Sequence, residues 1–290
     1  MAKNKLSAVL GLLTGALVWG LIWYPYRALD ASGASGLHAT LITYALALGL
    51  SLLLFRRQLA PLLRPDGILV LIALASGWTN LAYVLGMVHG EVMQVLLLFY
   101  LAPLWTVLLA RLLLGERPGL TGVLIVLLSL AGAATMLWEP GFRIPIPHTR
   151  AEWFGLSAGL TFALSNVLIR KAAHHPIPVK STAAFAGVTV IALAMLPLEG
   201  GPAAGWQAFA AGTALWMLPT LGLVLLATNV AVQHGLNNLS ANQAIVILLA
   251  ELVVAAVSAY FLAGETMRWN EWAGGAMIVA ATLLSGRLAH

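Results

Sequence analysis

Hydrophobic residues follow one another along this chain in long blocks, with few polar residues inside them. Each block is about 20 residues long, which is the length that an α-helix needs to cross the hydrocarbon core of a bilayer. The pattern therefore predicts an all-α polytopic membrane protein with ten transmembrane helices. These helices are expected at residues 6–27, 37–55, 67–88, 91–113, 118–138, 152–171, 179–197, 214–236, 240–262 and 270–287.

The second half of the chain repeats the first at a separation of 149 positions. Asn80 aligns with Asn229 and Glu116 with Glu265, with no gap between them. Because each half contains five spans, an odd number, the second copy is expected to lie inverted in the membrane relative to the first. We therefore expect one transmembrane unit built from two inverted five-helix repeats. The repeats are expected at residues 1–145 and 146–290.

Composition supports a membrane protein, and charge predicts its orientation. Hydrophobic residues make up 61% of the chain and charged residues 9%, whereas charged residues are about 25% of an ordinary soluble domain. If the N-terminus is cytoplasmic, eleven Lys and Arg residues fall on the inner side and four on the outer side, as the positive-inside rule requires. We therefore expect a multi-pass protein of the cell inner (cytoplasmic) membrane with both termini in the cytoplasm.

The same residues exclude several classes of protein. The basic residues are spread over separate loops, so no nucleic-acid-binding surface is expected. The chain has no cysteine, which excludes disulfides, cysteine–zinc sites and thiol catalysis. His89, His148, His174 and His175 fall in loops or at span ends, so no catalytic cluster is expected at membrane depth. We expect no enzyme, no cofactor and no metal site.

Glu251 is the one ionisable residue near the centre of a predicted span. A carboxylate at membrane depth is costly, and such residues usually mark functional sites. Glu251 is expected either to bind substrate or take up a coupling proton, or to form hydrogen bonds between helices.

Amide side chains occupy the third and eighth spans. Asn80 and Asn229 are equivalent in the repeat, Gln233 follows Asn229 by four residues, and Tyr83 shares the helix face of Asn80. A polar face on a helix in lipid points to the protein interior or to a wet cavity. These residues are expected to line a central site or to close the bundle through hydrogen bonds between helices.

Aromatic residues accompany these polar positions. Trp19 lies deep in the first span, and Phe162 and Asn166 are four residues apart in the sixth. Each is a candidate for the wall of a substrate site or for the core. Tyr100 is central in the fourth span, just before Pro103, which removes a backbone hydrogen bond from the helix. This break is expected to act as a hinge or as a static kink, and it is expected in the first half only.

Gln94 and Gln243 occupy equivalent positions at the starts of the fourth and ninth spans. In inverted halves, one lies near the outer face and the other near the inner face. They are candidates, together with Pro103, for gating residues. The alternatives are helix capping and ordinary packing in the bundle.

Two short motifs carry a family resemblance. One runs over residues 101–104 (LAPL) and 115–117 (GER), and its counterpart over 249–252 (LAEL) and 264–265 (GE). Together with the duplication, they resemble the motifs of EamA-type exporters in the drug/metabolite transporter (DMT) superfamily. Residues 92–103 are most similar to aromatic amino acid exporters of the YddG type. The proline that usually follows the ninth-span glutamate in this family is a leucine here.

This resemblance implies a secondary transporter that exports large apolar or aromatic amino acids by alternating access. It also implies a central cavity lined by the first, third, fourth, sixth, eighth and ninth spans. The residues agree in part, because no buried Lys or Arg is expected that would bind a phosphate. The alternatives are export of other small metabolites or drugs, a membrane-embedded enzyme, and a receptor that binds without transport. The expected partners are a small-molecule substrate and the lipid bilayer, with the protein a monomer or a homodimer.

Overall fold

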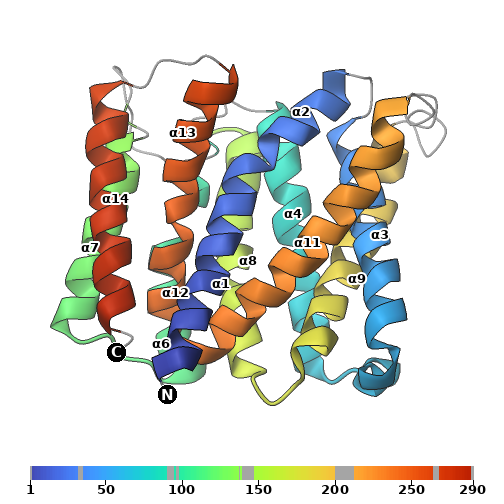
Figure 1. Cartoon of the computed structure of the whole chain (residues 1–290), viewed down its shortest axis with the longest axis horizontal. Helices are drawn as coiled ribbons and strands as arrows, with labels where there is room; N and C mark the ends of the chain where they lie inside the picture. The colour runs from blue at the N-terminus through green and yellow to red at the C-terminus, as the bar shows by residue number, and fades with distance from the viewer. Residues whose placement is uncertain are drawn as a thin grey trace.

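The computed structural model of the chain is a bundle of helices that run between two ends of the molecule, with both termini at the same end (Figure 1). The structure describes residues 2–31, 35–89, 95, 98–136, 138, 147–199, 212–263 and 268–288, and no strand occurs among them. The first half contains α1 (Ala2–Leu21), α2 (Trp23–Ala31), α3 (Gly36–Phe55), α4 (Gly67–His89), α6 (Ala102–Leu114) and α7 (Leu120–Met136). The second half contains α8 (Arg150–Lys171), α9 (Ile177–Met195), α11 (Gly212–Asn238), α12 (Ala241–Leu248), α13 (Ala250–Ala263) and α14 (Trp269–Leu288). Short 3₁₀ turns lie at η1 (Arg56–Gln58), η2 (Ala60–Leu63) and η3 (Leu196–Glu199).

Most of the predicted spans correspond to these helices, whereas the start of the fourth span, predicted from residue 91, lies largely outside the described residues. Within the described residues, seven stretches are long and apolar enough to cross a membrane. They are Lys5–Tyr26, Gly36–Gln58, Gly67–Gly86, Arg150–Lys171, Ile177–Met195, Trp216–Asn238 and Ala241–Leu262. Three shorter apolar helices cover Ala102–Leu114, Leu120–Thr135 and Trp272–Leu284. The helices agree with the predicted all-helical, polytopic membrane protein.

Local sequence sets several helix ends. Helix α8 begins after Thr149, whose hydroxyl oxygen accepts the backbone N–H of Glu152 at 3.2 Å, satisfying one of the free donors at the helix start. Helix α6 ends at Gly115, whose φ of 69° lies in the left-handed region that favours glycine. The glycine turns the chain sharply and sends Glu116 back towards the bundle.

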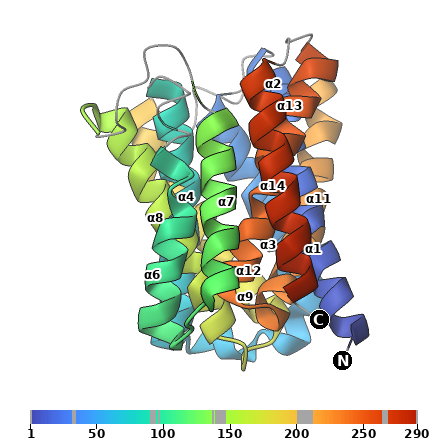
Figure 2. The ribbon, with the colours of Figure 1, turned by 90° about the vertical axis from the view of Figure 1, so that its left-hand side faces the viewer.

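The contacts between helices form a regular set. Helix α1 packs against α11 and α13, whereas α8, from the second half, packs against α4 and α6. Helix α4 also contacts α9, and α11 contacts α3, while the pairs α3–α9 and α7–α14 each join one helix from each half. Figure 2 shows α7 and α14 side by side. By the repeat in the sequence, the equivalent helices are α1 and α8, α3 and α9, α4 and α11, α6 and α13, and α7 and α14. When each helix is exchanged for its equivalent, the contacts named here map onto one another.

Glycines allow the tightest of these approaches. A Cβ atom on Gly235 of α11 would lie 2.8 Å from the carbonyl oxygen of Ala8 in α1. Its equivalent, Gly86 of α4, would place a Cβ atom 3.2 Å from the carbonyl oxygen of Ala151 in α8. Small residues at such crossings let helix backbones approach closely in a membrane, where van der Waals contact drives association.

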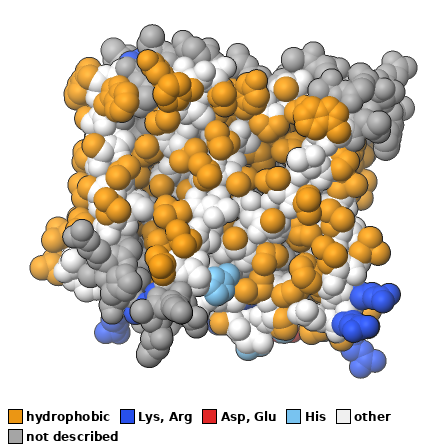
Figure 3. Space-filling view, viewed as in Figure 1, with side chains coloured by type: hydrophobic (Ala, Val, Ile, Leu, Met, Phe, Trp, Pro, Cys, Tyr) orange, Lys and Arg blue, Asp and Glu red, His pale blue; other side chains and the backbone are white. Residues whose placement is uncertain are grey.

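The outer surface is apolar along the length of the helices, as Figure 3 shows for one face. On that face, most of the Lys and Arg side chains lie near the edge where both termini lie. The most exposed tryptophans lie near the other end of the bundle, away from the termini. They are Trp138, Trp153, Trp216, Trp269 and Trp272. Tryptophan is typical of the membrane–water interface.

Candidate functional site

A narrow cavity lies where the start of α6, the middle of α8 and the junction between α12 and α13 meet. Its lining contains four of the predicted site residues, Tyr100, Pro103, Phe162 and Glu251. The other lining residues are Phe99, Ala102, Ile245, Leu248 and Leu249. The free volume is about 10 Å³, which is near the lower limit for a single water molecule. The walls are therefore almost in contact in this conformation.

Tyr100 and Glu251 are joined across the cavity wall. The Tyr100 hydroxyl donates a hydrogen bond to Oε1 of Glu251 at 3.3 Å. Tyr100 is buried, and Glu251 is partly buried in the first turn of α13. The free N–H groups and the dipole at a helix N-terminus favour a negative charge there. One half of the chain thus supplies a hydroxyl donor, and the other supplies a carboxylate.

An aromatic cluster surrounds this pair. The ring centroid of Phe99 lies 5.1 Å from that of Tyr83, 5.3 Å from that of Tyr100 and 5.4 Å from that of Phe162. Trp19 of α1 meets Phe162 edge-on at 6.2 Å. The structure therefore brings together the predicted aromatic residues of the first, third, fourth and sixth spans. Such a wall suits an apolar or aromatic ligand.

Phe99 is at the centre of the cluster, although it was not among the predicted site residues. The sequence carried one signal for it, because the backbone carbonyl that Pro103 deprives of a partner is that of Phe99. Gly159 of α8 approaches this same carbonyl closely, since a Cβ atom there would collide with it. The absence of a side chain at position 159 lets α8 lie directly against the cluster.

Both spans that form the cavity are interrupted, and at equivalent positions. Tyr100 and Leu101 form a turn before α6, with Pro103 in the first turn of that helix. Leu249, which aligns with Tyr100 in the repeat, forms a turn between α12 and α13. The expectation of a break in the first half only was therefore wrong. At the second break the N–H of Leu252 bonds to the carbonyl of Leu249 at 3.1 Å, a three-residue tightening that needs no proline.

The predicted asparagine pair lies outside the lining of this cavity. Asn80 accepts a hydrogen bond from the Tyr44 hydroxyl of α3 at 2.9 Å and donates one to the Ser76 carbonyl at 3.0 Å. Asn229 accepts a hydrogen bond from Nε2 of Gln233 at 2.9 Å within α11. Each asparagine thus bonds within its own half, and a shared central contact between them stays a prediction.

Two of the predicted site residues are buried amides that keep an unused hydrogen-bonding atom. Nδ2 of Asn166 in α8 and Oε1 of Gln233 in α11 have no partner among the described residues. These side chains are 5% and 0% exposed. An unpaired buried polar atom costs about 1–3 kcal/mol, so a water molecule or a ligand group that paired with either atom would be stabilised. Asn166 lies about one helical turn from Phe162, on the side of the cavity nearer the termini.

An ionic network lies at the end of the bundle that carries the termini. Arg170, at the end of α8, donates from Nε to Oε1 of Glu116 at 2.6 Å. Oε2 of Glu116 accepts the backbone N–H of Ala241, the first residue of α12, at 3.0 Å. Glu116 therefore ties together the ends of α6 and α8 and the start of α12. These helices also form walls of the cavity.

Lys180 lies beside this network, in the first turn of α9. Its Nζ atom donates to the carbonyl of Ile169 at 3.0 Å and to Oδ1 of Asn237 at 2.5 Å. The side chain is 0% exposed, so the chain buries one lysine, although outside the lining for which no Lys or Arg was expected. The reason is that α9 begins at Ile177 and carries Lys180 into the bundle, where two oxygens satisfy its charge. Lys180 is not part of the cavity lining.

Of the two predicted gating glutamines, the structure describes only Gln243. Gln243 forms a capping box with Ser240 at the start of α12: Ser240 Oγ accepts the N–H of Gln243 at 3.2 Å, and Gln243 Oε1 accepts the N–H of Ser240 at 3.3 Å. Gln243 therefore caps a helix, which was one of the alternatives to a gating role. The capped helix start lies next to the network around Glu116. Gln94 lies outside the described residues.

Comparison with known proteins indicates a common family. The sequence profile of the EamA-like transporter family matches this chain twice, over residues 6–138 and 149–287. An uncharacterized transporter of Archaeoglobus fulgidus is 29% identical over 228 residues, covering 77% of this chain and 78% of the relative. An uncharacterized transporter of Pseudomonas aeruginosa is 29% identical over 254 residues, covering 80% of this chain and 78% of the relative.

A solved crystal structure, whose title names no activity, has the same fold. It matches with a TM-score of 0.76 at 18% sequence identity and covers 98% of this chain and 97% of that chain. At this level of identity the likeness concerns the fold alone.

Proposed function

Because this chain belongs to the EamA-like transporter family, we propose that it is a secondary transporter whose substrate site is the cavity beside Tyr100 and Glu251. The observation that carries the proposal is the hydrogen bond between these two residues, which joins two interrupted spans, one from each half. Substrate sites of many secondary transporters lie at such interrupted helices between repeats. Glu251 supplies an ionisable group at that point, and ionisable groups at membrane depth usually serve substrates or ions.

The proposed substrate is an amino acid with a large apolar or aromatic side chain. The rings of Phe99, Tyr100 and Phe162 form a wall for such a side chain, and Glu251 offers a carboxylate for its ammonium group. The unpaired Nδ2 of Asn166 is a donor for the substrate carboxylate. Among the described residues that line the cavity, none is Lys or Arg, which disfavours phosphorylated substrates.

We propose that transport proceeds by alternating access between two inverted five-helix repeats. The support comes from the set of helix contacts, which maps onto itself when equivalent helices are exchanged. The family profile also matches each half separately. A bundle with this internal symmetry can adopt two related conformations in which opposite sides of the central site are closed. The small cavity fits a conformation in which the side nearer the termini is shut.

In this proposal, Glu116 and Arg170 form the closed gate on the side of the termini. Their ion pair joins α6 of the first half to α8 of the second, and Glu116 also holds the start of α12 through Ala241. Opening on this side must separate these helix ends. Gln243 stabilises the same helix start through its capping box and acts at the gate by that route.

We further propose that the gate faces the cytoplasm of a cell whose inner membrane holds the protein. On the face drawn in Figure 3, Lys and Arg side chains lie mainly near the edge where the termini lie. The exposed tryptophans mark the other edge. Positive residues are typical of cytoplasmic loops, so export would run from the gate of Glu116 towards the tryptophan edge.

Counterflow in proteoliposomes tests the substrate. Vesicles that contain the purified protein are loaded with one unlabelled amino acid and exposed to its labelled form, across a panel of amino acids and with or without a pH gradient. We expect protein-dependent accumulation of large apolar or aromatic amino acids. Accumulation that responds to the pH gradient would show coupling to protons. If no amino acid accumulates, the substrate proposal is wrong, and other small metabolites become the next panel.

A matched pair of variants shows whether the flux uses the proposed site. Phe162→Leu changes the cavity wall, whereas Phe261→Leu changes a phenylalanine that is 76% exposed on the outer surface of α13. We expect counterflow to fall in the first variant and to be retained in the second. Equal effects from both would place the substrate elsewhere.

A further inference from the structure

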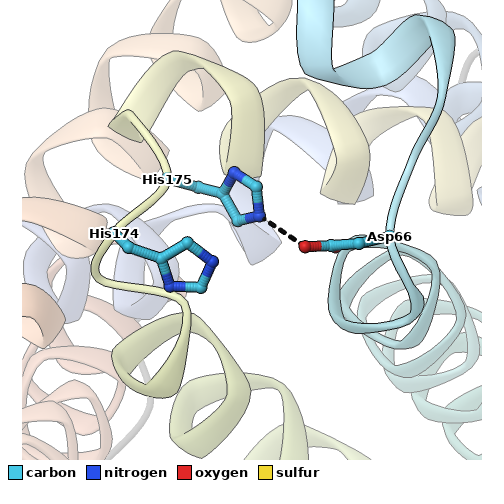
Figure 4. A group of neighbouring side chains, drawn as sticks. All are labelled: Asp66, His174 and His175. Atoms are coloured by element: carbon cyan, nitrogen blue, oxygen red, sulfur yellow. Dashed lines mark hydrogen bonds and ion pairs between the residues drawn. The ribbon is translucent and has the colours of Figure 1, made fainter.

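Three side chains that could coordinate a metal ion meet at the end of the bundle where the termini lie, apart from the cavity. Asp66 directly precedes α4, and His174 and His175 lie in the turn between α8 and α9. The potential ligand atoms of the three residues all lie within 4.8 Å of one another. Figure 4 shows the two imidazole rings beside each other and the Asp66 carboxylate facing His175.

The backbones that carry these side chains are held in place. Oδ1 of Asp66 accepts the N–H of Leu69 at 3.0 Å and so caps helix α4, which leaves Oδ2 directed towards the histidines. The N–H of His175 bonds to the carbonyl of Ala172 at 3.0 Å, which fixes the turn after α8. The ring centroids of His174 and His175 are 4.2 Å apart. The positions of the three side chains are therefore set by two helix ends.

Asp66 and His175 are already in contact. Nε2 of His175 lies 2.8 Å from Oδ2 of Asp66. This hydrogen bond lowers the pKa of Asp66 below its ordinary value. Two ligands at about 2.0–2.2 Å from a tetrahedral zinc ion are about 3.3 Å apart, so a small opening of this contact makes room for the ion.

We propose that Asp66, His174 and His175 form a site for a divalent transition-metal ion such as Zn²⁺, with water completing the coordination. Two imidazole nitrogens and one carboxylate oxygen form a ligand set that zinc, nickel and copper accept. The two exposed ligands and the surface position make this an open site, accessible to ions in the surrounding solution.

The bound ion would link segments that belong to different halves of the chain. Asp66 lies at the start of α4, and the histidines join α8 to α9, two helices that pack against α4. The metal would therefore stabilise the conformation in which these segments are in contact. Ligand binding to one conformation raises its stability against unfolding and against any state in which the site is broken.

Metal titration of the purified protein tests the site. The protein is prepared without a polyhistidine tag, stripped with a chelator, and titrated with Zn²⁺ by calorimetry and with Co²⁺ by visible absorption. We expect one equivalent of metal to bind and to raise the thermal midpoint. His174→Ala should weaken binding by at least about tenfold, although it leaves the Asp66–His175 contact intact. That variant separates loss of a ligand from loss of the hydrogen bond.

His148→Ala is the matched control, because His148 is also exposed but lies before the opposite end of α8, about 33 Å away. It should bind metal as the unaltered chain does. The proposal is overturned if the unaltered chain binds no metal, or if His174→Ala and His175→Ala bind it as tightly as His148→Ala. Because the readout is binding, the result is independent of whether the chain transports amino acids.

Discussion

Oε1 of Glu251 accepts a hydrogen bond from the hydroxyl of Tyr100 at 3.3 Å, and the two residues come from opposite halves of the chain. Tyr100 stands at the interruption of the fourth span and aligns with Leu249, which stands at the interruption of the ninth span. Glu251 lies two residues after Leu249. The contact therefore joins the halves at the point where both helices are broken. The bond is long for an O–H···O hydrogen bond, so under the proposed function the ammonium group of an amino acid would compete for the carboxylate at little cost.

Replacing Glu251 by Gln should reduce transport without unfolding the protein. Gln keeps the size of the side chain and removes its charge, so the substrate ammonium or a coupling proton loses its partner. We expect counterflow to fall by at least about tenfold, equivalent to about 1.4 kcal/mol. Tyr100→Phe removes only one donor, and we expect a loss of about fivefold or less because one hydrogen bond contributes about 1 kcal/mol. Equal activity of the Gln variant and the unaltered chain would leave Glu251 a packing residue.

Replacing Phe162 by Leu should alter the order of substrate preference. The ring of Phe162 contacts both Phe99 and Trp19, and an aromatic pair contributes about 0.5–1.5 kcal/mol beyond its buried area. We expect counterflow of aromatic amino acids to fall about two- to tenfold relative to that of leucine. A uniform loss for every amino acid would indicate damage to the fold, and no change in the order would remove Phe162 from the site.

Replacing Arg170 by Gln should open the side that carries the termini. The native chain has no cysteine, so Leu248→Cys places a single thiol in the cavity wall. In inside-out vesicles, a membrane-impermeant maleimide should label that thiol several-fold faster when Arg170 is Gln. Lys171→Gln is the control, because Lys171 is the exposed neighbour of Arg170 and has no part in the network. Equal labelling rates in both backgrounds would contradict a gate at Arg170.

Replacing Gly159 by Ala should destabilise the protein. The added Cβ atom would collide with the carbonyl of Phe99, and overpacking of this kind costs about 1–3 kcal/mol. Gly49→Ala is the control, because a Cβ atom there meets no heavy atom within 4 Å and alanine favours a helix by up to about 1 kcal/mol. We expect a lower thermal midpoint for the first variant and an equal or higher one for the second. The reverse order would show that α8 does not lie against Phe99.

Much of the fold was readable from the sequence because a bilayer leaves few choices. Backbone groups in lipid must bond within their own helix, so each apolar block had to be a helix, and its length followed from the thickness of the membrane. The Gly-Glu pair after the fourth span was visible as a motif. The ion pair that Glu116 forms could not be predicted, because its partner Arg170 lies 54 residues further along the chain.

The sequence predicted the kinds of residue that form the candidate site but only some of the individual residues. Tyr100, Phe162 and Glu251 stood out because aromatic and charged residues are unusual at the centre of a span, and the structure brings them together. Phe99 and Lys180 did not stand out. An apolar ring resembles any other core residue in the sequence, and a lysine at a span end looks like a loop residue until the start of the helix is known.

The sequence by itself determined that the chain is built of apolar helices that cross a membrane several times, that its second half repeats the first, and which residue types the apolar blocks contain. These depend on local hydrophobicity and on comparison of the chain with itself. Only the tertiary structure decided that Tyr100 meets Glu251, that Asn80 bonds to Tyr44, and that Asp66 meets two histidines. Those contacts join residues far apart in the chain, and they depend on how closely glycine lets one helix approach another, a distance that no local pattern records.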